Sequence, residues 1–307
     1  MSNLQLVLLT LVPIFALIGL GYALRRVGFP GDRFWPDLER LVYYLMFPAL
    51  LVEKLGTAQV SLGRVLWMAA AVVATVLTVA ALVWLSRRAF RVSDPGFTSI
   101  FQGAIRFNTY IGIATALGLF GTDGAAVAAM VLVVMIPLVN VLCVGVLTHY
   151  SAAETSYAAI LRGILRNPLI IGCAIGALLN FTGIGLPLGS DAMLEIVGRA
   201  ALPMGLLTVG AGLQLRVAWT ARGAIGGGLL VKLLVMPAVA YGFAHLLGLG
   251  GLESQVLVLF AALPTATSAY ILARQLGGDA ALMAGVLTAQ TAASALTLPA
   301  WLVFVTT

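Results

Sequence analysis

The sequence predicts an all-α integral membrane protein with ten transmembrane helices, arranged as two inverted repeats of five helices. Three observations support this prediction. The chain of 307 residues is 61% hydrophobic and only 9% charged, with a mean hydropathy of +1.07. A set of proline, glycine and aspartate residues recurs about 155 residues further along the chain, and the basic residues concentrate in alternate loops. A soluble domain of this length cannot bury so much apolar surface, so lipid is the expected solvent.

The internal repeat consists of proline, glycine and aspartate residues that recur in the same order. Pro13, Gly21, Gly28 and Pro48 match Pro168, Gly176, Gly183 and Pro203, and Gly121, Asp123 and Ala125 match Gly277, Asp279 and Ala281. One repeat is expected over residues 1–150 and the other over 151–307. Because each repeat holds five spans, an odd number, the second must lie upside down relative to the first, as in many secondary transporters.

Ten apolar stretches are long enough to cross about 30 Å of hydrocarbon, which takes about 20 helical residues. They are expected near 5–24, 41–60, 65–85, 97–119, 125–147, 163–182, 192–213, 224–247, 253–273 and 280–304. The net charge of +6 comes mainly from short loops, so no nucleic-acid partner is expected. Cys143 and Cys173 fall inside apolar stretches and are interpreted as core residues rather than as a disulfide.

The distribution of Lys and Arg predicts the orientation of these spans. Loops on one side carry Arg25, Arg26, Arg33, Arg40, Arg87, Arg88, Arg91, Arg162, Arg166, Arg216, Arg222 and Arg274, and the other side has only Lys54, Arg64 and Arg199. Basic loops are retained in the cytoplasm. The sequence therefore predicts a multi-pass protein of the cell membrane with both termini outside, in agreement with the inverted repeat.

The fourth and ninth expected spans correspond in the repeat, and each has a polar stretch near its middle, at 102–112 and 263–270. Asn108 aligns with Pro264. Proline breaks or kinks a helix, and Asn competes for local backbone hydrogen bonds, although a proline kink also serves packing alone. Two breaks at equivalent positions predict one central site, whose half-helix N-termini suit an anion. The expected substrate-binding residues there are Arg106, Asn108, Thr109, Tyr110, Pro264, Thr265, Thr267 and Ser268.

Two cations inside the spans are candidate substrate ligands. An arginine at the bilayer centre costs about 2.5–3.5 kcal/mol on insertion scales, so Arg106 is expected to have a function or a partner. It either binds a substrate carboxylate through two hydrogen bonds or satisfies carbonyl groups at the end of the first half-helix. Lys232, in the eighth span, either binds substrate or extends its flexible chain to the inner surface.

Candidates for ion coupling and for hinges follow from the remaining polar and helix-breaking residues. Glu53 either pairs with its neighbour Lys54 or carries a coupled proton. Sodium bound by neutral oxygen atoms is the other option, with Gln102, Asn108, Thr265 and Gln290 as its ligands, and neither a cofactor nor an acidic metal site is expected. Pro48 and Pro203 predict two further helix breaks, and Gly112 is grouped with them as a hinge. Tyr43, Tyr44 and Phe47, which precede Pro48, either line a cavity or serve packing.

Four stretches form an ordered set: RFNTYIG at 106–112, LRNPLIIG at 165–172, AALPMGLLTVG at 200–210, and LPTATSAY at 263–270 followed by the Gly-Gly-Asp of 277–279. Their order and spacing resemble the auxin efflux carrier family, whose bacterial members include malonate permease-like proteins. The resemblance extends over essentially the whole chain. One departure is Asn108, which stands where the crossover of the fourth span would have a proline.

The resemblance implies a fold related to the bile-acid sodium symporters. Spans 1, 2, 6 and 7 would form a scaffold, and spans 3–5 and 8–10 a transport domain that moves like an elevator. Substrate would bind where spans 4 and 9 cross, and family substrates are carboxylates. Plant members often carry a large hydrophilic loop between the halves. This chain lacks one, so auxin is not the expected substrate.

The sequence thus predicts secondary active transport of small organic anions by alternating access. A sodium-coupled symporter of the bile-acid type is an alternative within the same fold, and an anion channel or a non-transporting sensor is an alternative of another class. An enzyme is not expected. An intramembrane protease needs a nucleophile paired with a base, or two aspartates, at the same depth in the membrane, and the sequence offers neither. Proton or sodium coupling and a homodimer both remain open.

Overall fold

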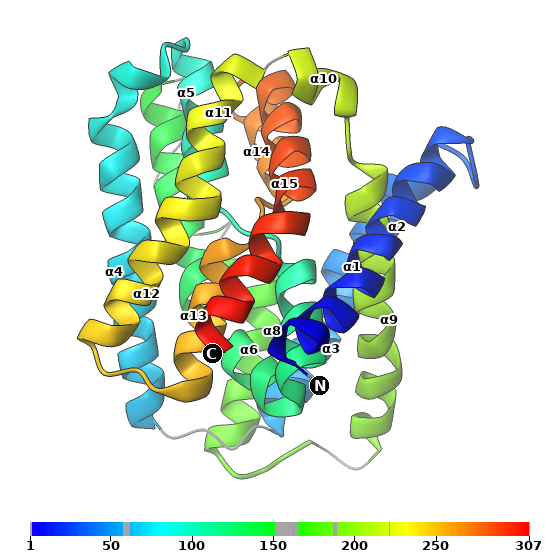
Figure 1. Ribbon diagram of the computed structural model, residues 1–307. Helices are drawn as coiled ribbons and strands as arrows, with labels where there is room; N and C mark the ends of the chain where they lie inside the picture. The colour runs from blue at the N-terminus through cyan, green and yellow to red at the C-terminus, as the bar shows by residue number, and fades with distance from the viewer. Residues whose placement is uncertain are drawn as a thin grey trace.

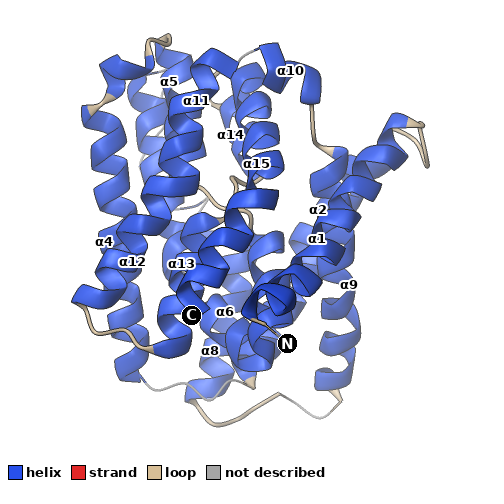
Figure 2. Cartoon of the chain, in the orientation of Figure 1, coloured by secondary structure: helices blue, strands red, loops and turns tan. Residues whose placement is uncertain are grey.

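The computed structural model describes residues 2–57, 62–150, 162, 165–186, 189–220 and 222–306. Within these residues the chain is helical throughout and contains no β-strand (Figures 1 and 2). The predicted all-α class is confirmed. The helical segments long and apolar enough to cross a membrane are Asn3–Arg26, Leu66–Leu85, Asp94–Tyr150, Ser190–Ala211, Ile225–Leu246 and Ala280–Thr306.

The first half of the chain folds into α1 (Asn3–Arg26), α2 (Phe34–Leu41), a π-helical turn η1 (Val42–Met46), α3 (Phe47–Gly56), α4 (Leu62–Leu85), a 3₁₀ turn η2 (Arg87–Phe90), α5 (Asp94–Ile105) and α6 (Thr109–Tyr150). Gly121 interrupts α6 with φ 65° and ψ −154°, a backbone conformation that favours glycine. The chain therefore leaves the helix between the expected spans 97–119 and 125–147.

The second half folds into α8 (Pro168–Phe181), α9 (Ser190–Ala211), α10 (Leu215–Thr220), α11 (Arg222–Leu230), a π-helical turn η3 (Val231–Val235), α12 (Met236–Leu246), α13 (Gly251–Ala262), α14 (Ser268–Gln275) and α15 (Ala280–Thr306). Helices α8 and α13 are apolar but shorter than the spans that the sequence predicts there. Helix α8 has 14 residues and α13 has 12, where the sequence predicts spans over 163–182 and 253–273. The second difference arises because the chain leaves the helix after Ala262.

The helices pack in two groups. In the first group α9 packs against α1 and α3, and α3 packs against α8. In the second group α4, α12, α13 and α15 pack with α5 and α14, and α15 also contacts α1 (Figure 1). Helix α6 contacts members of both groups. Large apolar side chains on outer helices, such as Leu9 on α1 and Leu178 on α8, remain exposed at 65% and 63%. Exposed apolar surface of this extent fits a hydrocarbon environment.

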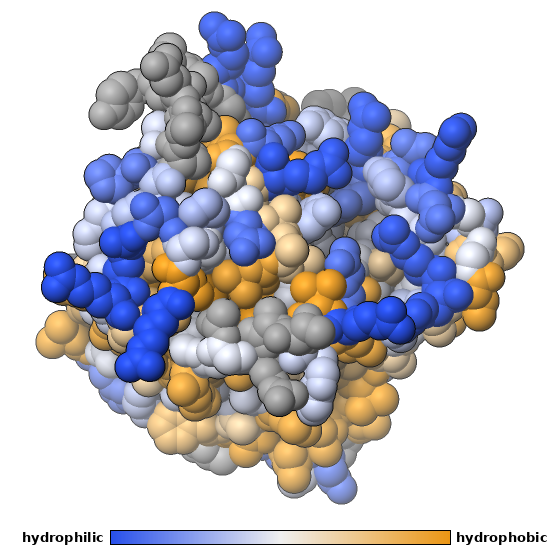
Figure 3. Space-filling view, turned by 90° about the horizontal axis from the view of Figure 1, so that it is seen from above, coloured by the Kyte–Doolittle hydropathy of each residue, from blue (hydrophilic) through white to orange (hydrophobic). Residues whose placement is uncertain are grey.

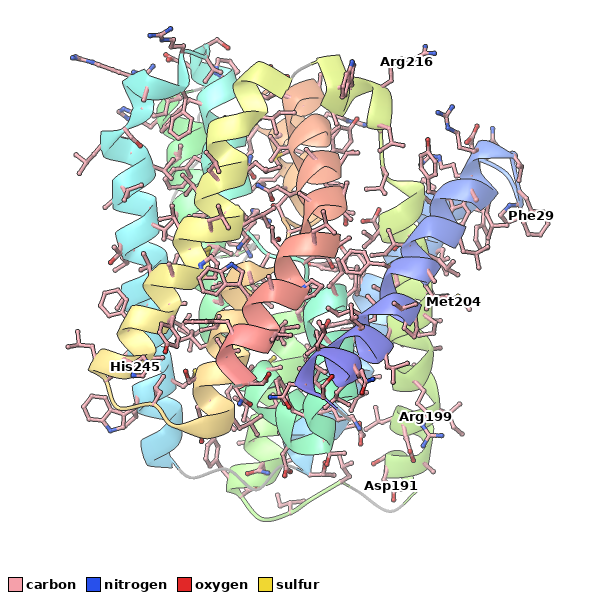
Figure 4. All side chains as sticks on the ribbon, viewed as in Figure 1. Phe29, Asp191, Arg199, Met204, Arg216 and His245 are labelled. Atoms are coloured by element: carbon pink, nitrogen blue, oxygen red, sulfur yellow. The ribbon has the colours of Figure 1, made fainter. Side chains whose placement is uncertain are left out.

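The connections of the chain separate into two ends. The α1–α2 and α4–α5 connections and α10 lie at the upper end, where Arg216 is also found, whereas Asp191 and Arg199 lie at the lower end (Figures 1 and 4). Viewed from above, the upper end carries many hydrophilic residues (Figure 3). The chain termini lie together, because Asn3 Nδ2 donates a hydrogen bond of 2.9 Å to the carbonyl oxygen of Thr306.

The helix break predicted at Pro203 is not found, whereas the break or hinge roles predicted for Pro48 and Gly112 stay predictions. Helix α9 continues through Pro203, and Pro48 lies at the start of α3, where the π-helical turn precedes it without an interruption. Gly112 is helical and belongs to the first turns of α6. Neighbouring helices explain this continuity, because close packing supports the backbone around a proline inside a membrane. A Cβ atom on Gly198 of α9 would lie 3.0 Å from Leu50 Cα of α3.

Candidate functional site

The first helix break separates α5 from α6. Arg106 follows the last residue of α5 and has extended backbone, with φ −76° and ψ 159°. The next helix begins at Thr109 and is capped by Asn108, whose Oδ1 accepts a hydrogen bond of 3.2 Å from the amide of Ile111. The first backbone N–H groups of a helix have no acceptor within the helix, and a capping side chain supplies one. The sequence therefore ends one half-helix and starts another within three residues.

The second break separates α13 from α14. Leu263 leaves the helix with φ −65° and ψ 147°, and Pro264 follows it without an amide hydrogen. Helix α14 resumes at Ser268, and no side chain caps it in the manner of Asn108. The chain thus leaves the helical conformation at both positions where the sequence predicts a break.

The two breaks meet in the interior of the molecule (Figure 1, the teal and orange loops). The amide of Asn108 donates a hydrogen bond of 2.7 Å to the carbonyl oxygen of Pro264. Gln290 on α15 connects the same two segments: its Oε1 accepts from the amide of Thr265 at 2.9 Å, and its Nε2 donates to the carbonyl oxygen of Gly103 at 3.0 Å. These contacts satisfy backbone groups that have no partner in a helix.

Arg106 places a buried positive charge beside this crossing. The side chain is 6% exposed, and its Nη1 donates to Ser268 Oγ at 3.2 Å while Nη2 donates to Asn140 Oδ1 at 2.7 Å. Both partners are neutral, and Nε is buried without a hydrogen-bond partner in the described part of the chain. None of the ion pairs between described residues includes Arg106. The guanidinium is therefore held in place without a compensating carboxylate.

A cavity of about 550 Å³ opens at the crossing. Six predicted site residues line it, namely Arg106, Asn108, Thr109, Tyr110, Thr267 and Ser268. The wall also includes polar or charged side chains that the sequence did not assign to the site, namely Glu39, Arg40, Asn140 and Asn167. Of the three aromatic residues predicted to line a cavity or to pack, Tyr43 and Tyr44 line it, whereas Phe47 is fully buried and packs against the ring of Tyr110.

Glu39 is the most informative of the residues that sequence reasoning missed. It lies on α2, and its Oε1 accepts a hydrogen bond of 2.7 Å from Thr267 Oγ1, just before α14. In the sequence, Glu39 lies in a loop that was used only for its basic residues, as a signal of orientation. Asn140 is a single amide side chain within an apolar stretch. Only the packing of α2 and α6 against the second break brings these side chains to the cavity.

Other predicted site residues lie behind the cavity wall. Pro264 and Thr265 belong to the second break, and Gln102 and Gln290 are fully buried beside it. Both polar side-chain atoms of Gln102, the Nδ2 of Asn108 and the Oγ1 of Thr265 are buried without a partner in the described chain. The crossing thus holds several buried polar atoms that have no hydrogen-bond partner within the described chain.

Two predicted residues are not brought to the cavity. Lys232 lies in η3, is fully buried, and places its Nζ 3.1 Å from Met236 Sδ. Glu53 forms an ion pair of 3.0 Å with Lys54. The described residues contain no group of three or more His, Cys, Asp or Glu side chains suited to a metal ion, and Cys143 and Cys173 are free, buried thiols.

Comparisons with known proteins give the class of the molecule. The profile of the membrane transport protein family matches residues 6–302, so the chain belongs to this family, the auxin efflux carrier family that its sequence patterns resemble. It is a multi-pass membrane transporter and not an enzyme.

Three relatives extend this result over nearly the whole chain. An "Uncharacterized transporter" of Methanothermobacter thermautotrophicus is 28% identical over 307 residues, covering 95% of this chain and 96% of the relative. The "Putative malonate transporter" of Rhizobium meliloti is 28% identical over 289 residues, covering 87% and 85%. A transporter of Methanocaldococcus jannaschii is 23% identical over 317 residues, covering 98% of both chains.

Proposed function

We propose that this protein is a secondary active transporter of small organic anions that bind as carboxylates at the crossing of the two broken helices. The observation that carries the proposal is Arg106, a buried guanidinium whose hydrogen-bond partners, Ser268 and Asn140, are neutral. A buried charge without an ion-pair partner is unfavourable, so its presence beside a cavity of a membrane transporter supports an anionic ligand. The name of the Rhizobium meliloti relative supports malonate as the first substrate to test.

The residues around Arg106 suit a carboxylate. Nε is unpartnered, and a guanidinium binds a carboxylate through two parallel hydrogen bonds when two of its N–H groups face the ligand. Asn108 Nδ2 is a second unpartnered donor in the same wall, and the N-terminus of α6 begins beside it. Helix N-termini favour anions because their amides lack partners and carry the positive end of the helix dipole.

The two packing groups of the fold support alternating access as the proposed mechanism. In the proposed arrangement, ten spans form two inverted five-helix repeats, residues 1–150 and 151–307. Spans 1, 2, 6 and 7, which contain α1, α3, α8 and α9, act as a scaffold. Spans 3–5 and 8–10 carry both breaks and move as an elevator-like unit past it. The basic upper end faces the cytoplasm, and both termini lie outside.

The decisive experiment is malonate uptake into liposomes containing the purified protein. We expect Arg106→Ala to abolish saturable uptake while the protein remains folded. The matched control is Arg199→Ala, because Arg199 is exposed at the lower end of the molecule and pairs there with Glu195. Unchanged uptake by well-folded Arg106→Ala would reject the proposed site. Loss of uptake in Arg199→Ala as well would show that the assay reports general damage.

The same assay separates the alternatives. A bile-acid type symporter needs sodium, and the unpartnered oxygen atoms of Gln102 and Thr265 are the feature that favours such a site. Replacing sodium by potassium at constant pH would then stop uptake. A channel would conduct without saturating at the slow rates of a carrier, and a sensor would bind malonate without moving it.

A further inference from the structure

Glu39 is the only acidic side chain among the described residues that line the cavity. It is partly buried, and its carboxylate is held by the Thr267 hydroxyl at 2.7 Å. None of the ion pairs between described residues includes Glu39. The carboxylate therefore lies in the anion-binding cavity with a neutral hydrogen-bond partner, and the proposed transport mechanism gives it no role so far.

The position of Glu39 connects the two helix groups at the site. Its helix, α2, packs against α9 and runs into η1 and α3, which belong to the proposed scaffold. Thr267 belongs to the second break, and the next residue, Ser268, accepts a hydrogen bond from Arg106. One carboxylate of the scaffold thus reaches the segment of the transport unit that also holds the substrate-binding guanidinium.

The charges and titratable groups around Glu39 come from several elements. Arg40 neighbours it on α2, Tyr43 and Tyr44 come from η1, Arg106 follows α5, and Tyr110 comes from α6. Helix α9, which packs on α2, contributes no residue to the cavity wall in the described chain. Arg106 and Arg40 are the cations that share the cavity with the Glu39 carboxylate.

An anionic substrate brings further carboxylates into this cavity. Two like charges in a partly desolvated site repel each other, and the repulsion is relieved when one of them takes up a proton. Anion binding and proton binding are then linked, and each favours the other by the same factor. The Thr267 hydroxyl suits both states of Glu39, because it donates to a carboxylate and accepts from a carboxylic acid.

We propose that Glu39 is the proton-binding residue that couples anion transport to the proton gradient, so that substrate and proton move together. A proton from the solution binds a carboxylate oxygen of Glu39 as the anion binds Arg106, and it leaves to the opposite solution when the anion leaves. No electrons or covalent bonds to the substrate are involved. The inference rests on the proposed function and names its coupling ion. Glu53, which is paired with Lys54, has no place in this cycle.

The test measures proton uptake when malonate is added to the purified protein in weak buffer near pH 7. A pH indicator and calorimetric titrations in two buffers of different ionisation enthalpy both count the protons. We expect wild-type protein to take up protons on binding, and Glu39→Gln to bind malonate without doing so. The control, Glu195→Gln, alters an exposed carboxylate paired with Arg199 and should behave as wild type.

Transport gives the matching readout. With a pH gradient across the liposome membrane, wild-type protein should accumulate malonate above its equilibrium level, whereas Glu39→Gln should only equilibrate it. A gradient-driven accumulation that survives in Glu39→Gln would overturn the inference. So would malonate binding to the wild-type protein without proton uptake, and both results would leave the proposed function intact. Absence of malonate binding and uptake in the wild type would instead reject the proposed function for this substrate.

A measurement on the wild-type protein covers the case in which Glu39→Gln does not fold. Infrared difference spectra recorded on adding carbon-13 malonate separate the bands of the ligand from those of the protein. We expect a protein carbonyl band of a protonated carboxylic acid to appear and a protein carboxylate band to disappear. Glu39→Asp, which keeps a titratable group, should shift the new band. A spectrum without the carboxylic acid band would contradict the proposal.

Discussion

The two helix breaks share a backbone plan but differ in chemistry. In each, a helix ends, the chain becomes extended, and a new helix begins, and the amide of Asn108 joins the first break to Pro264 of the second. The first break supplies a guanidinium, and the side chain of Asn108 caps its own second helix. The second supplies hydroxyl groups, and the Thr267 hydroxyl donates a hydrogen bond to Glu39 rather than capping α14.

This difference separates the contacts that hold the crossing together from the side chains that would bind a ligand. Backbone contacts between the breaks build the crossing, so either break needs the other to satisfy its amides and carbonyl groups. The charge comes from the first break alone, because Ala262 stands where the repeat aligns Arg106. A duplicated frame therefore holds a site whose ligand contacts are not duplicated. The predictions below change one break, the link between them, or a residue outside both.

The largest effect is expected when the charge at the first break is kept but its geometry is lost. In Arg106→Lys all N–H donors sit on one nitrogen, so the side chain loses the planar fork that contacts Ser268 and Asn140 with separate nitrogens and can bind a carboxylate through two parallel hydrogen bonds. We expect malonate affinity to fall about 10- to 100-fold, which corresponds to about 1.4–2.8 kcal/mol. Calorimetric titration measures this change. Wild-type affinity in Arg106→Lys would show that only the charge matters.

The link between the breaks is tested by Gln290→Leu. This change leaves the amide of Thr265 and the carbonyl oxygen of Gly103 unpaired in a buried region. Each unpaired group destabilises by about 1–3 kcal/mol, so thermal unfolding should shift clearly downward. Gln255→Leu is the control, because its contact with the carbonyl oxygen of Val305 is longer, at 3.4 Å, and only partly buried. Equal shifts in both variants would remove the special role given to Gln290.

The close approach of the first break to the second is tested by Gly112→Ala. A Cβ atom there would lie 2.7 Å from Leu263 Cδ1 and 2.9 Å from Phe260 Cζ, both near the second break. Overpacking of this kind destabilises by about 1–3 kcal/mol. Gly145→Ala, on the same helix with no atom within 4 Å, should be neutral or slightly stabilising. Denaturation of the purified variants would check this difference, and matching midpoints would contradict it.

The smallest effect is expected at Lys232, the second cation that the sequence singled out. It lies outside both breaks and the cavity, and its nearest polar contact is Met236 Sδ. Burying an amine without an ion-pair partner is unfavourable, so an apolar side chain of similar length should be tolerated there. Lys232→Met should therefore keep malonate uptake. Loss of uptake in a folded variant would restore the substrate role that the sequence suggested.

The helical class and the position of both breaks could be predicted because they depend on local chemistry. Composition requires lipid, and Asn108 and Pro264 interrupt helices through their own side chains and backbone. The break expected at Pro203 was wrong because tertiary packing decides whether a proline interrupts a membrane helix. Small residues such as Gly198 let α3 and α9 approach closely there, and this contact is not visible in a proline pattern.

The candidate site was only partly predictable for a related reason. Arg106, Thr267 and Ser268 stand out as polar residues within apolar spans, and they do line the cavity. Glu39 belongs to a basic loop in the sequence, and only the packing of α2 carries it to Thr267. Gln290 was expected to be an ion ligand. Its side-chain oxygen and nitrogen are instead both engaged with backbone atoms, so a coupling role for it stays a prediction.

The most direct test of the central claim is an experimental structure of the wild-type protein in lipid nanodiscs with malonate bound. We expect a malonate carboxylate within hydrogen-bonding distance of Arg106, with Asn108 Nδ2 as a further donor, inside the cavity between the two breaks. Malonate bound elsewhere, with Arg106 still contacting only Ser268 and Asn140, would contradict it.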